Sequence, residues 1–243
     1  MLSLEEKVNQ LNTILKHSKR IVFFGGAGVS TESGIPDFRS KDGLYHQKYH
    51  KDPEYMLSHT CLVREPEAFY KFYFDKMIYE GAQPNVCHKK LVELEKRGKL
   101  SAIITQNIDG LHQQAGSHHV LELHGNAYRL FCTNCGHDYH LKSIRREKIP
   151  TCPSCGGLLR PDVVLYGEAL NETIVEETIY EIKQCDTLII GGTSLVVYPA
   201  ATFVQYFRGK NLIIINKDQT TMDGQADLII HDAIGKVFSK IDI

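Results

Sequence analysis

One stretch near the start of the chain constrains the fold more than any other. Residues 21–24 (Ile-Val-Phe-Phe) form a short apolar run that is long enough for one buried strand. The run leads directly into Gly25, Gly26 and Gly28, where the lack of side chains lets backbone approach a ligand closely. We expect a helix to follow and to direct its free N–H groups at a phosphate. The sequence therefore predicts a nucleotide-binding turn at the end of a buried strand.

The turn departs from the dinucleotide fingerprint of hydride-transfer enzymes. Thr31 stands at the third glycine position, and no second strand ending in Asp or Glu follows about 20 residues later. Instead, residues 35–39 (Ile-Pro-Asp-Phe-Arg) supply a stiff turn, a carboxylate, an aromatic ring and a guanidinium. We therefore expect a dinucleotide to be bound here, but differently from the way a dehydrogenase binds it.

Strand-like and helix-like segments alternate along the rest of the chain. Ser3 and Glu6 have capping-box spacing at the start of the first expected helix, whereas residues 40–65 lack periodicity and are interpreted as a loop. This alternation is typical of an α/β fold with a Rossmann-like parallel sheet and helices on both faces. Helices are expected at 3–17, 66–80, 85–97, 171–184, 199–208 and 232–240, and strands at 101–105, 120–123, 163–166, 187–190 and 212–215.

Polar residues follow the strands at the points where each strand ends. In parallel sheets, ligands bind at the carboxyl ends of the strands. We therefore expect residues 25–39, residues 106–109, His124, residues 191–194 and Asn216 to lie around one site.

Four of the seven cysteines form two pairs, Cys132-x-x-Cys135 and Cys152-x-x-Cys155. An odd count without an export signal argues against disulfides, and this spacing is typical of a zinc ribbon. Two redox pairs or four unrelated thiols are the alternatives. His137 and His140 are rival ligands, but four cysteines complete a tetrahedral shell and leave no open position for catalysis. The pattern predicts structural Zn²⁺.

Composition places the chain among ordinary globular proteins. It has 243 residues, of which 42% are hydrophobic and 23% charged, so one large domain, or one domain with a small insert, is expected. The larger part would comprise about 1–40, 82–125 and 161–243, and the smaller part a helical insert at 41–81 with a zinc module at 126–160. A net charge of −1 gives no reason to expect nucleic acid or a membrane as a partner. A cytoplasmic location is expected, because no run approaches membrane-spanning length.

These motifs together resemble the sirtuins, NAD-dependent protein deacylases, and in particular the bacterial members. The resemblance implies transfer of an acyl group from lysine to ADP-ribose with release of nicotinamide. It implies NAD and Zn²⁺ as cofactors and acylated lysines of proteins as substrates. The matching stretches are residues 26–39, 105–112, 124–125, 160–168 and 192–200 and the four paired cysteines, and residues 212–216 extend the match.

The resemblance also assigns roles to individual residues. His124 is the expected general base, and the ordinary pKa of histidine suits that task at neutral pH. Phe38 is expected to shield the reactive ribose carbon from water, and Asp109 to order the ribose and the nicotinamide amide. The full set of expected NAD contacts is Ala27, Thr31, Phe38, Arg39, Gln106, Asn107, Ile108, Asp109, His124, Thr193, Ser194, Asn216 and Ile234.

By the same resemblance, the substrate peptide is expected to add as a strand between two segments of the chain. The expected contacts are Val163, Val164, Tyr166, Gly167 and Val196, with Tyr166 where the family more commonly has Phe.

Acyl choice is expected to depend on the helix of the small part. Members that prefer succinyl or malonyl groups carry Tyr and Arg three residues apart there, and the best matches in this chain are Tyr73 and Lys76. Lysine lacks the bidentate fork that suits a carboxylate, so acetyl is the expected group.

Two alternative functions remain for the chain as a whole. One is a mono-ADP-ribosyltransferase, which uses the same cofactor, and the other is a zinc-ribbon nucleic-acid module, which the near-neutral charge disfavours.

Overall fold

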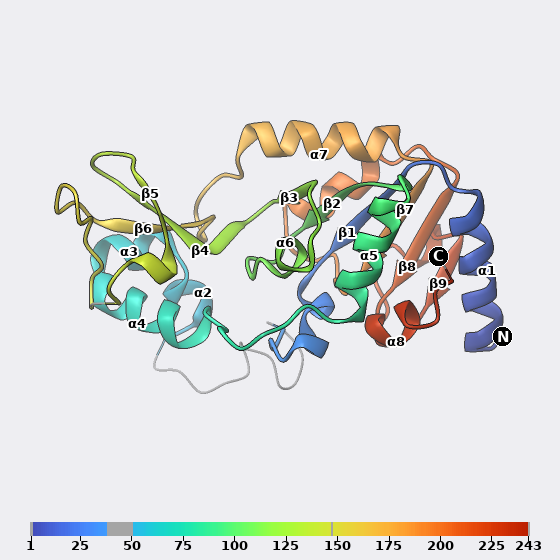
Figure 1. Cartoon of the computed structure of the whole chain (residues 1–243), viewed down its shortest axis with the longest axis horizontal. Helices are drawn as coiled ribbons and strands as arrows, with labels where there is room; N and C mark the ends of the chain where they lie inside the picture. Colours follow the sequence, from blue (N-terminus) through green and yellow to red (C-terminus); the bar gives the residue numbers. More distant parts are fainter. Residues whose placement is uncertain (1, 38–50, 147, 243) are drawn as a thin grey trace.

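The computed structural model describes residues 2–37, 51–146 and 148–242 (Figure 1). Its larger part is built on six parallel strands in the order β3-β2-β1-β7-β8-β9. This order reverses between β1 and β7, as in doubly wound nucleotide-binding sheets, and the expected α/β class is confirmed. The strands are β1 (Ile21–Gly25), β2 (Leu100–Thr105), β3 (Val120–Glu122), β7 (Thr187–Gly191), β8 (Asn211–Ile215) and β9 (Leu228–Ile230).

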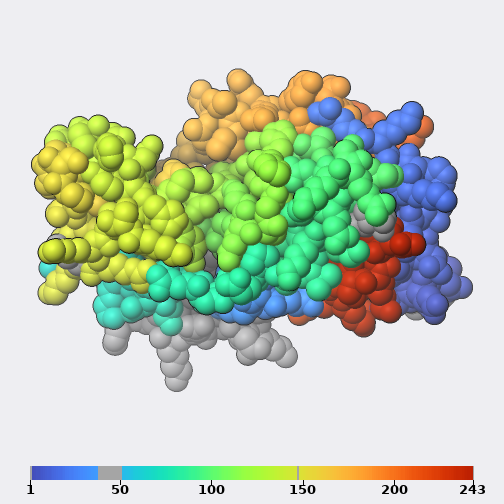
Figure 2. Space-filling model, in the orientation of Figure 1, coloured from blue at the N-terminus to red at the C-terminus, as the bar shows by residue number. Residues whose placement is uncertain are grey.

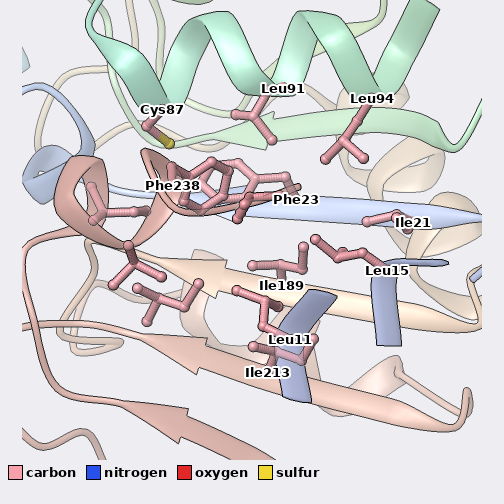
Figure 3. Packing of buried hydrophobic residues seen from close by; sticks show 14 of the residues in the cluster. Leu11, Leu15, Ile21, Phe23, Cys87, Leu91, Leu94, Ile189, Ile213 and Phe238 are labelled. Atoms are coloured by element: carbon pink, nitrogen blue, oxygen red, sulfur yellow. The ribbon is translucent and has the colours of Figure 1, made fainter. Parts of the chain in front are cut away.

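Helices cover both faces of this sheet. On one face, α1 (Leu4–His17), α5 (Val86–Lys96) and α8 (Ile234–Phe238) pack on β1, β7 and β8 through one apolar cluster (Figure 3). On the other face, α7 (Glu172–Gln184) and the 3-10 helix η5 (Ala200–Tyr206) bury a second cluster. Every residue of β1 and β7 is buried, which explains why these strands are continuous apolar runs rather than alternating ones.

Local signals account for several helix boundaries. The Ser3 hydroxyl accepts the Glu6 N–H (3.2 Å) and the Glu6 carboxylate accepts the Ser3 N–H (2.7 Å), which confirms the capping box of α1. Asn85 caps α5 in the same reciprocal way with His88. The short elements α6 (Leu111–Ala115) and β9 were not expected from the sequence, because three to five residues carry too little periodicity.

A second, smaller module lies beside the sheet domain. Its antiparallel sheet has the order β5-β4-β6, and helices α2, α3 and α4 pack against it around an aromatic-rich core. Figure 1 shows β4 leading from the sheet domain into the module, and in Figure 2 the two parts form one continuous elongated body. The module's elements are β4 (Gly125–Cys132), β5 (Asp138–His140), β6 (Leu159–Val163), α2 (Pro53–Met56), α3 (His59–Arg64) and α4 (Pro66–Lys76).

The structure corrects the expected strand at 163–166. The chain instead forms β6, which pairs antiparallel with β4 in the small module and ends at Val163. The apolar run could not reveal this, because the buried face of β6 starts earlier, at Leu159. The expected boundary of the zinc module at residue 160 falls inside this strand.

Four further expectations need correction. Two 3-10 turns, η1 (Ala27–Val29) and η2 (Thr31–Ser33), follow β1 in place of a helix. Residues 53–64, expected as loop, form α2 and α3, because Asp52 and Ser58 cap them. Helix α4 ends at Lys76, before the expected Glu80, and the expected helix at 199–208 is the 3-10 helix η5.

Within the described ranges, no helix is both long enough and apolar enough to cross a membrane.

Candidate functional site

The site begins where the loops after β1 and β7 interlock. The Gly26 N–H donates to the Gly191 carbonyl (3.1 Å), and the Gly28 N–H donates to the Gly192 carbonyl (2.8 Å). A Cβ added to Gly28 would lie 2.8 Å from the Gly192 Cα, and one added to Gly192, whose φ is +58°, only 2.5 Å from the Val29 nitrogen. Only glycine fits this backbone-to-backbone contact. It lies at the point where the strand order reverses, the usual position of a dinucleotide crevice in such sheets.

The end of β2 adds polar side chains to the same edge. The Gln106 N–H donates to the Gly25 carbonyl (3.0 Å), and its Nε2 donates to the Thr193 hydroxyl (3.1 Å). Thr193 is buried and lies two residues after the end of β7. These bonds therefore connect the ends of β1, β2 and β7. The expected gathering of residues 106–109 with 191–194 is therefore present.

Ser30 joins Asn107 to Asp109. Its hydroxyl donates to the Asp109 carboxylate (2.6 Å) and accepts from Asn107 Nδ2 (3.1 Å). Asp109 also accepts the Leu111 N–H (2.9 Å). Burial raises the pKa of Asp109, which the bonds from Ser30 and Leu111 partly oppose. Ser30 was missed from the sequence. Its position in the glycine loop, one residue before Thr31, was the only available signal.

His124 lies just beyond β3, two residues after the buried Glu122. Its Nδ1 is 2.9 Å from the Gln106 carbonyl, which can only accept, so Nδ1 carries the proton and Nε2 the lone pair. Burial lowers the pKa of His124, and the Gln106 carbonyl partly opposes this shift. The ring is therefore neutral at pH 7 and has one basic nitrogen available.

The other expected cofactor residues that the structure describes lie in the segments after β1, β2, β7 and β8 or, for Ile234, at the start of α8. Ile108 accepts the Ala127 N–H through its carbonyl (2.8 Å), and the Thr31 hydroxyl donates to the Gly28 carbonyl (3.0 Å). Ile234 is 3% exposed and lies against Gly191. Asn216 donates to the Asp218 carbonyl (2.9 Å). Ala27 begins η1, Ser194 is exposed after β7, and the predictions for Phe38 and Arg39 lie outside the described residues.

The expected substrate segment begins beside His124. The Val164 N–H donates to the His124 carbonyl (3.0 Å), and Tyr166 and Val196 expose 40% and 44% of their surface. Gly167 adopts φ +89° next to Tyr166. In the part of the chain that the structure describes, the Val164 carbonyl and the Gly167 N–H have no hydrogen-bond partner. Both groups are therefore available to an added strand.

Tyr73 lies in the core of the small module and not on its surface. It is 2% exposed within the aromatic core of α4, and its hydroxyl donates to the Ala127 carbonyl. Burial raises the pKa of this phenol. The expected contact of Tyr73 with an acyl group stays a prediction. Lys76, in the last turn of α4, is half-buried.

The four paired cysteines meet in the small module. Their sulfur atoms all lie within 4.8 Å of one another, with 3.5 Å between Cys132 and Cys155 and 3.8 Å between Cys135 and Cys152. A tetrahedral Zn²⁺ with four thiolates requires sulfur atoms about 3.8 Å apart, so the set could hold zinc. His137 and His140 are not part of the cluster. His140 instead accepts the Lys142 N–H (3.2 Å).

Comparison with known proteins gives consistent results. A model of the Sir2 family matches residues 26–199. An NAD-dependent protein deacetylase of Clostridium perfringens is 54% identical over 242 residues, which cover 98% of this chain and 99% of the relative. The NAD-dependent protein deacetylase of Clostridium acetobutylicum is 52% identical over 97% of this chain and 98% of its own length.

Solved structures agree with the sequence relatives. The crystal structure of a Sir2 homologue in complex with NAD superimposes with a TM-score of 0.85 at 38% identity, covering 96% of this chain and 91% of that one. A Sir2 protein bound to acetylated peptide gives a TM-score of 0.85 at 33% identity, with 96% of each chain covered.

Proposed function

The chain belongs to the Sir2 family, and on that premise we propose that it is an NAD-dependent protein-lysine deacetylase. It would transfer the acetyl group of a lysine to ADP-ribose and release nicotinamide. One observation carries the proposal: a neutral histidine and a half-buried carboxylate network converge with the Gly28–Gly192 backbone contact at the carboxyl edge of one parallel sheet. We infer the dinucleotide crevice of such sheets beside this contact and call it the glycine crevice.

The residues of the crevice fit NAD. The contact between Gly28 and Gly192 leaves backbone without side chains where β1 and β7 diverge, which suits the close approach of a pyrophosphate. Ile234 and Asn216 lie on the β7–β8 side of this crevice, where we place the adenosine half. When bound, NAD supplies a ribose carbon from which nicotinamide can leave and a ribose hydroxyl that can take up the acyl group.

The Ser30–Asn107–Asp109 network would orient the other half of the cofactor. The bond from Ser30 fixes the Asp109 carboxylate, and the bond from Asn107 fixes Ser30, so little reorganisation is needed on binding. We assign to Asp109 the ordering of the ribose and the nicotinamide amide, through hydrogen bonds that its carboxylate oxygens accept.

His124 would act as the general base. Its protonated Nδ1 is held by the Gln106 carbonyl, so Nε2 is the atom that can remove a proton from a ribose hydroxyl. Because burial lowers its pKa, the imidazole is in its basic form at neutral pH. The Gln106 carbonyl also stabilises the imidazolium once the proton has been taken.

The acyl-lysine peptide would bind as a strand beside Val164 and Gly167, opposite Val196. The Val164 N–H is already bonded to the His124 carbonyl, which sets the distance between the substrate backbone and the base. Peptide recognition through backbone groups reads side chains loosely, so many acetylated proteins could serve as substrates.

Product analysis tests the proposal directly. The protein is incubated with NAD and an acetyl-lysine peptide, and the products are identified by mass spectrometry. The deacetylated peptide, nicotinamide and O-acetyl-ADP-ribose are expected. ADP-ribose attached to protein would instead indicate a mono-ADP-ribosyltransferase, and the absence of nicotinamide release would exclude both activities.

A further inference from the structure

The stretch 164–168 bridges the two parts of the molecule. At one end, the Val164 N–H is bonded to His124, which follows β3 of the sheet domain. At the other end, the Tyr166 N–H donates to the Leu57 carbonyl (3.0 Å), and the Tyr166 carbonyl accepts the His59 N–H (3.0 Å). Leu57 and His59 lie at the α2–α3 junction of the small module. The same short stretch therefore contacts both the proposed base and the module.

A single carboxylate holds this stretch in shape. Glu168 accepts the Leu165 N–H (2.9 Å), a guanidinium N–H of Arg160 and, through its other oxygen, Nδ1 of His59 (2.8 Å). The Glu168 N–H in turn donates to the Leu165 carbonyl (3.0 Å), which closes a tight turn between the two residues. Backbone, a strand residue and a helix residue thus meet at one side chain.

The ion pair between Glu168 and Arg160 is largely shielded from water. The side chains of Glu168 and Arg160 are only 17% and 18% exposed, whereas His59 is 54% exposed. Burial by itself raises the pKa of Glu168, but the bonds from Arg160, Leu165 and His59 outweigh this and lower the pKa overall. Glu168 is therefore ionised at neutral pH, and its hydrogen bonds are charge-assisted.

We propose that Glu168 is a positioning residue for the acyl-lysine peptide. Its carboxylate fixes the turn that places the Val164 carbonyl and the Gly167 N–H in line for an added strand. This inference rests on the deacetylase function proposed above. Glu168 contacts neither the glycine crevice nor the His124 ring in the described structure, so it should affect peptide binding and leave NAD binding unchanged.

Glu168→Gln tests this role, because the amide keeps the shape but loses the charge and one acceptor. The peptide KM should rise about tenfold, the size expected when a charge-assisted hydrogen bond becomes a neutral one. The values of kcat and of the NAD KM should stay within about twofold of the unmodified protein.

The chain offers a matched control in the sheet domain. Glu177 forms the same kind of contact with a histidine, at 2.8 Å from His119 Nε2, away from the proposed peptide segment. Glu177→Gln should leave the peptide KM unchanged. An unchanged peptide KM in Glu168→Gln, or a fall in kcat alone, would overturn the proposal.

Two further measurements separate the possible failures. If Glu168→Gln does not fold, His59→Ala decides, because this exposed residue contributes one arm only. A rise of about two- to threefold in peptide KM is then expected, the size for loss of one partly exposed hydrogen bond, and no rise overturns the role of Glu168. Direct binding of a fluorescent acetyl-lysine peptide is measured alongside. No binding by the unmodified protein refutes the deacetylase function itself, whereas equal binding by Glu168→Gln refutes only this inference.

Discussion

The sheet domain and the small module are stabilised in different ways. The sheet domain buries apolar residues on both faces of six strands, and its two clusters draw on helices from the whole length of the chain. The described part of the module has one three-stranded sheet, one aromatic-rich cluster and four cysteine sulfur atoms that lie within 4.8 Å of one another. The four thiols can bind a metal, and a bound metal would add its binding free energy to the stability of the module.

The two parts also differ in their proposed roles, since the reactive groups belong to the sheet domain and the module supports them. The groups that we propose to move a proton and to bind the dinucleotide lie on the edge of the sheet domain, at His124, Asp109 and the glycine loops. The module contributes four cysteines that can fill the tetrahedral shell of a metal and leave no position open for catalysis. Its Leu57 and His59 bond the backbone of Tyr166, in the stretch 164–168 that we propose binds the peptide. Damage to the module should therefore act on catalysis indirectly, and damage to the sheet edge directly.

The largest effect is expected from Cys132→Ser. Loss of one thiolate should release zinc, unfold much of residues 126–160 and lower activity by about 10²-fold or more, because structural zinc contributes its binding energy to folding. Zinc content by atomic absorption and proteolysis of the module measure this. Cys61→Ser is the matched control, a buried cysteine of the same module outside the cluster, and it should keep its zinc. A zinc-free Cys132→Ser protein with full stability and activity would disprove the structural role.

A smaller loss is expected in the sheet domain from Gly192→Ala. The new methyl group would meet Gly28 and Val29 backbone at 2.5–2.6 Å in a left-handed conformation, so unfolding free energy should fall by about 3 kcal/mol and NAD affinity with it. Gly98→Ala separates the two causes, since φ there is +68° but nothing lies within 4 Å. Its cost should be about 1 kcal/mol, measured by urea unfolding. Equal costs for both variants would show that the close approach is unimportant.

Acid should destabilise the sheet domain through two buried histidines. His88 and His112 pack ring to ring at 4.7 Å, both fully enclosed, and neither nitrogen of His112 has a partner among the described residues. Burial lowers the pKa of His88 to about 4 and that of His112 well below its ordinary value. The unfolded chain therefore binds protons that the folded chain does not, so stability is full above pH 6.5 and falls as the pH drops towards 4.

His112→Leu should flatten this pH dependence, because it removes one titrating ring and two unpaired polar atoms from the core. Urea unfolding between pH 7.5 and 4.5 measures the slope for both proteins. Identical slopes would show that His112 does not titrate with folding.

The smallest effect is expected from Lys76→Arg in the module. With Tyr73 buried in the core, a guanidinium at position 76 lacks the phenol that should accompany it. The ratio of kcat/KM for acetyl- and succinyl-peptides of one sequence should therefore shift by less than about threefold towards succinyl. A shift of tenfold or more would show that Tyr73 leaves the core to bind substrate.

The sheet domain could be predicted well from the sequence, and the module less well. Ile21–Phe24 and the Ser3–Glu6 box were readable because one buried strand and one capped helix each have a local signature. Residues 159–166 were not, because pairing with β4 depends on distant residues and only the second half of the run appears apolar. The caps at Asp52 and Ser58 were present but stood before helices too short to show a period.

The candidate site, too, could be predicted from the sequence only in part. Gln106, Asn107, Asp109 and His124 could be placed at strand ends from the sequence, and the structure brings them together. The roles of Ser30 and of the His88–His112 pair could not, since both depend on contacts between elements far apart in the chain. The acyl contact of Tyr73 stays a prediction, and its burial could not be foreseen because helical spacing does not show which face of a helix is buried.

His124→Ala tests the central claim most directly, because the claim is that the base lies on the sheet edge. The account predicts that O-acetyl-ADP-ribose formation slows by about 10²-fold or more, while NAD affinity by calorimetry and thermal stability stay close to those of the unmodified protein. His118→Ala, at an exposed histidine nearby in the chain, serves as the control and should retain full turnover. Near-normal turnover by a folded His124→Ala protein would contradict the account.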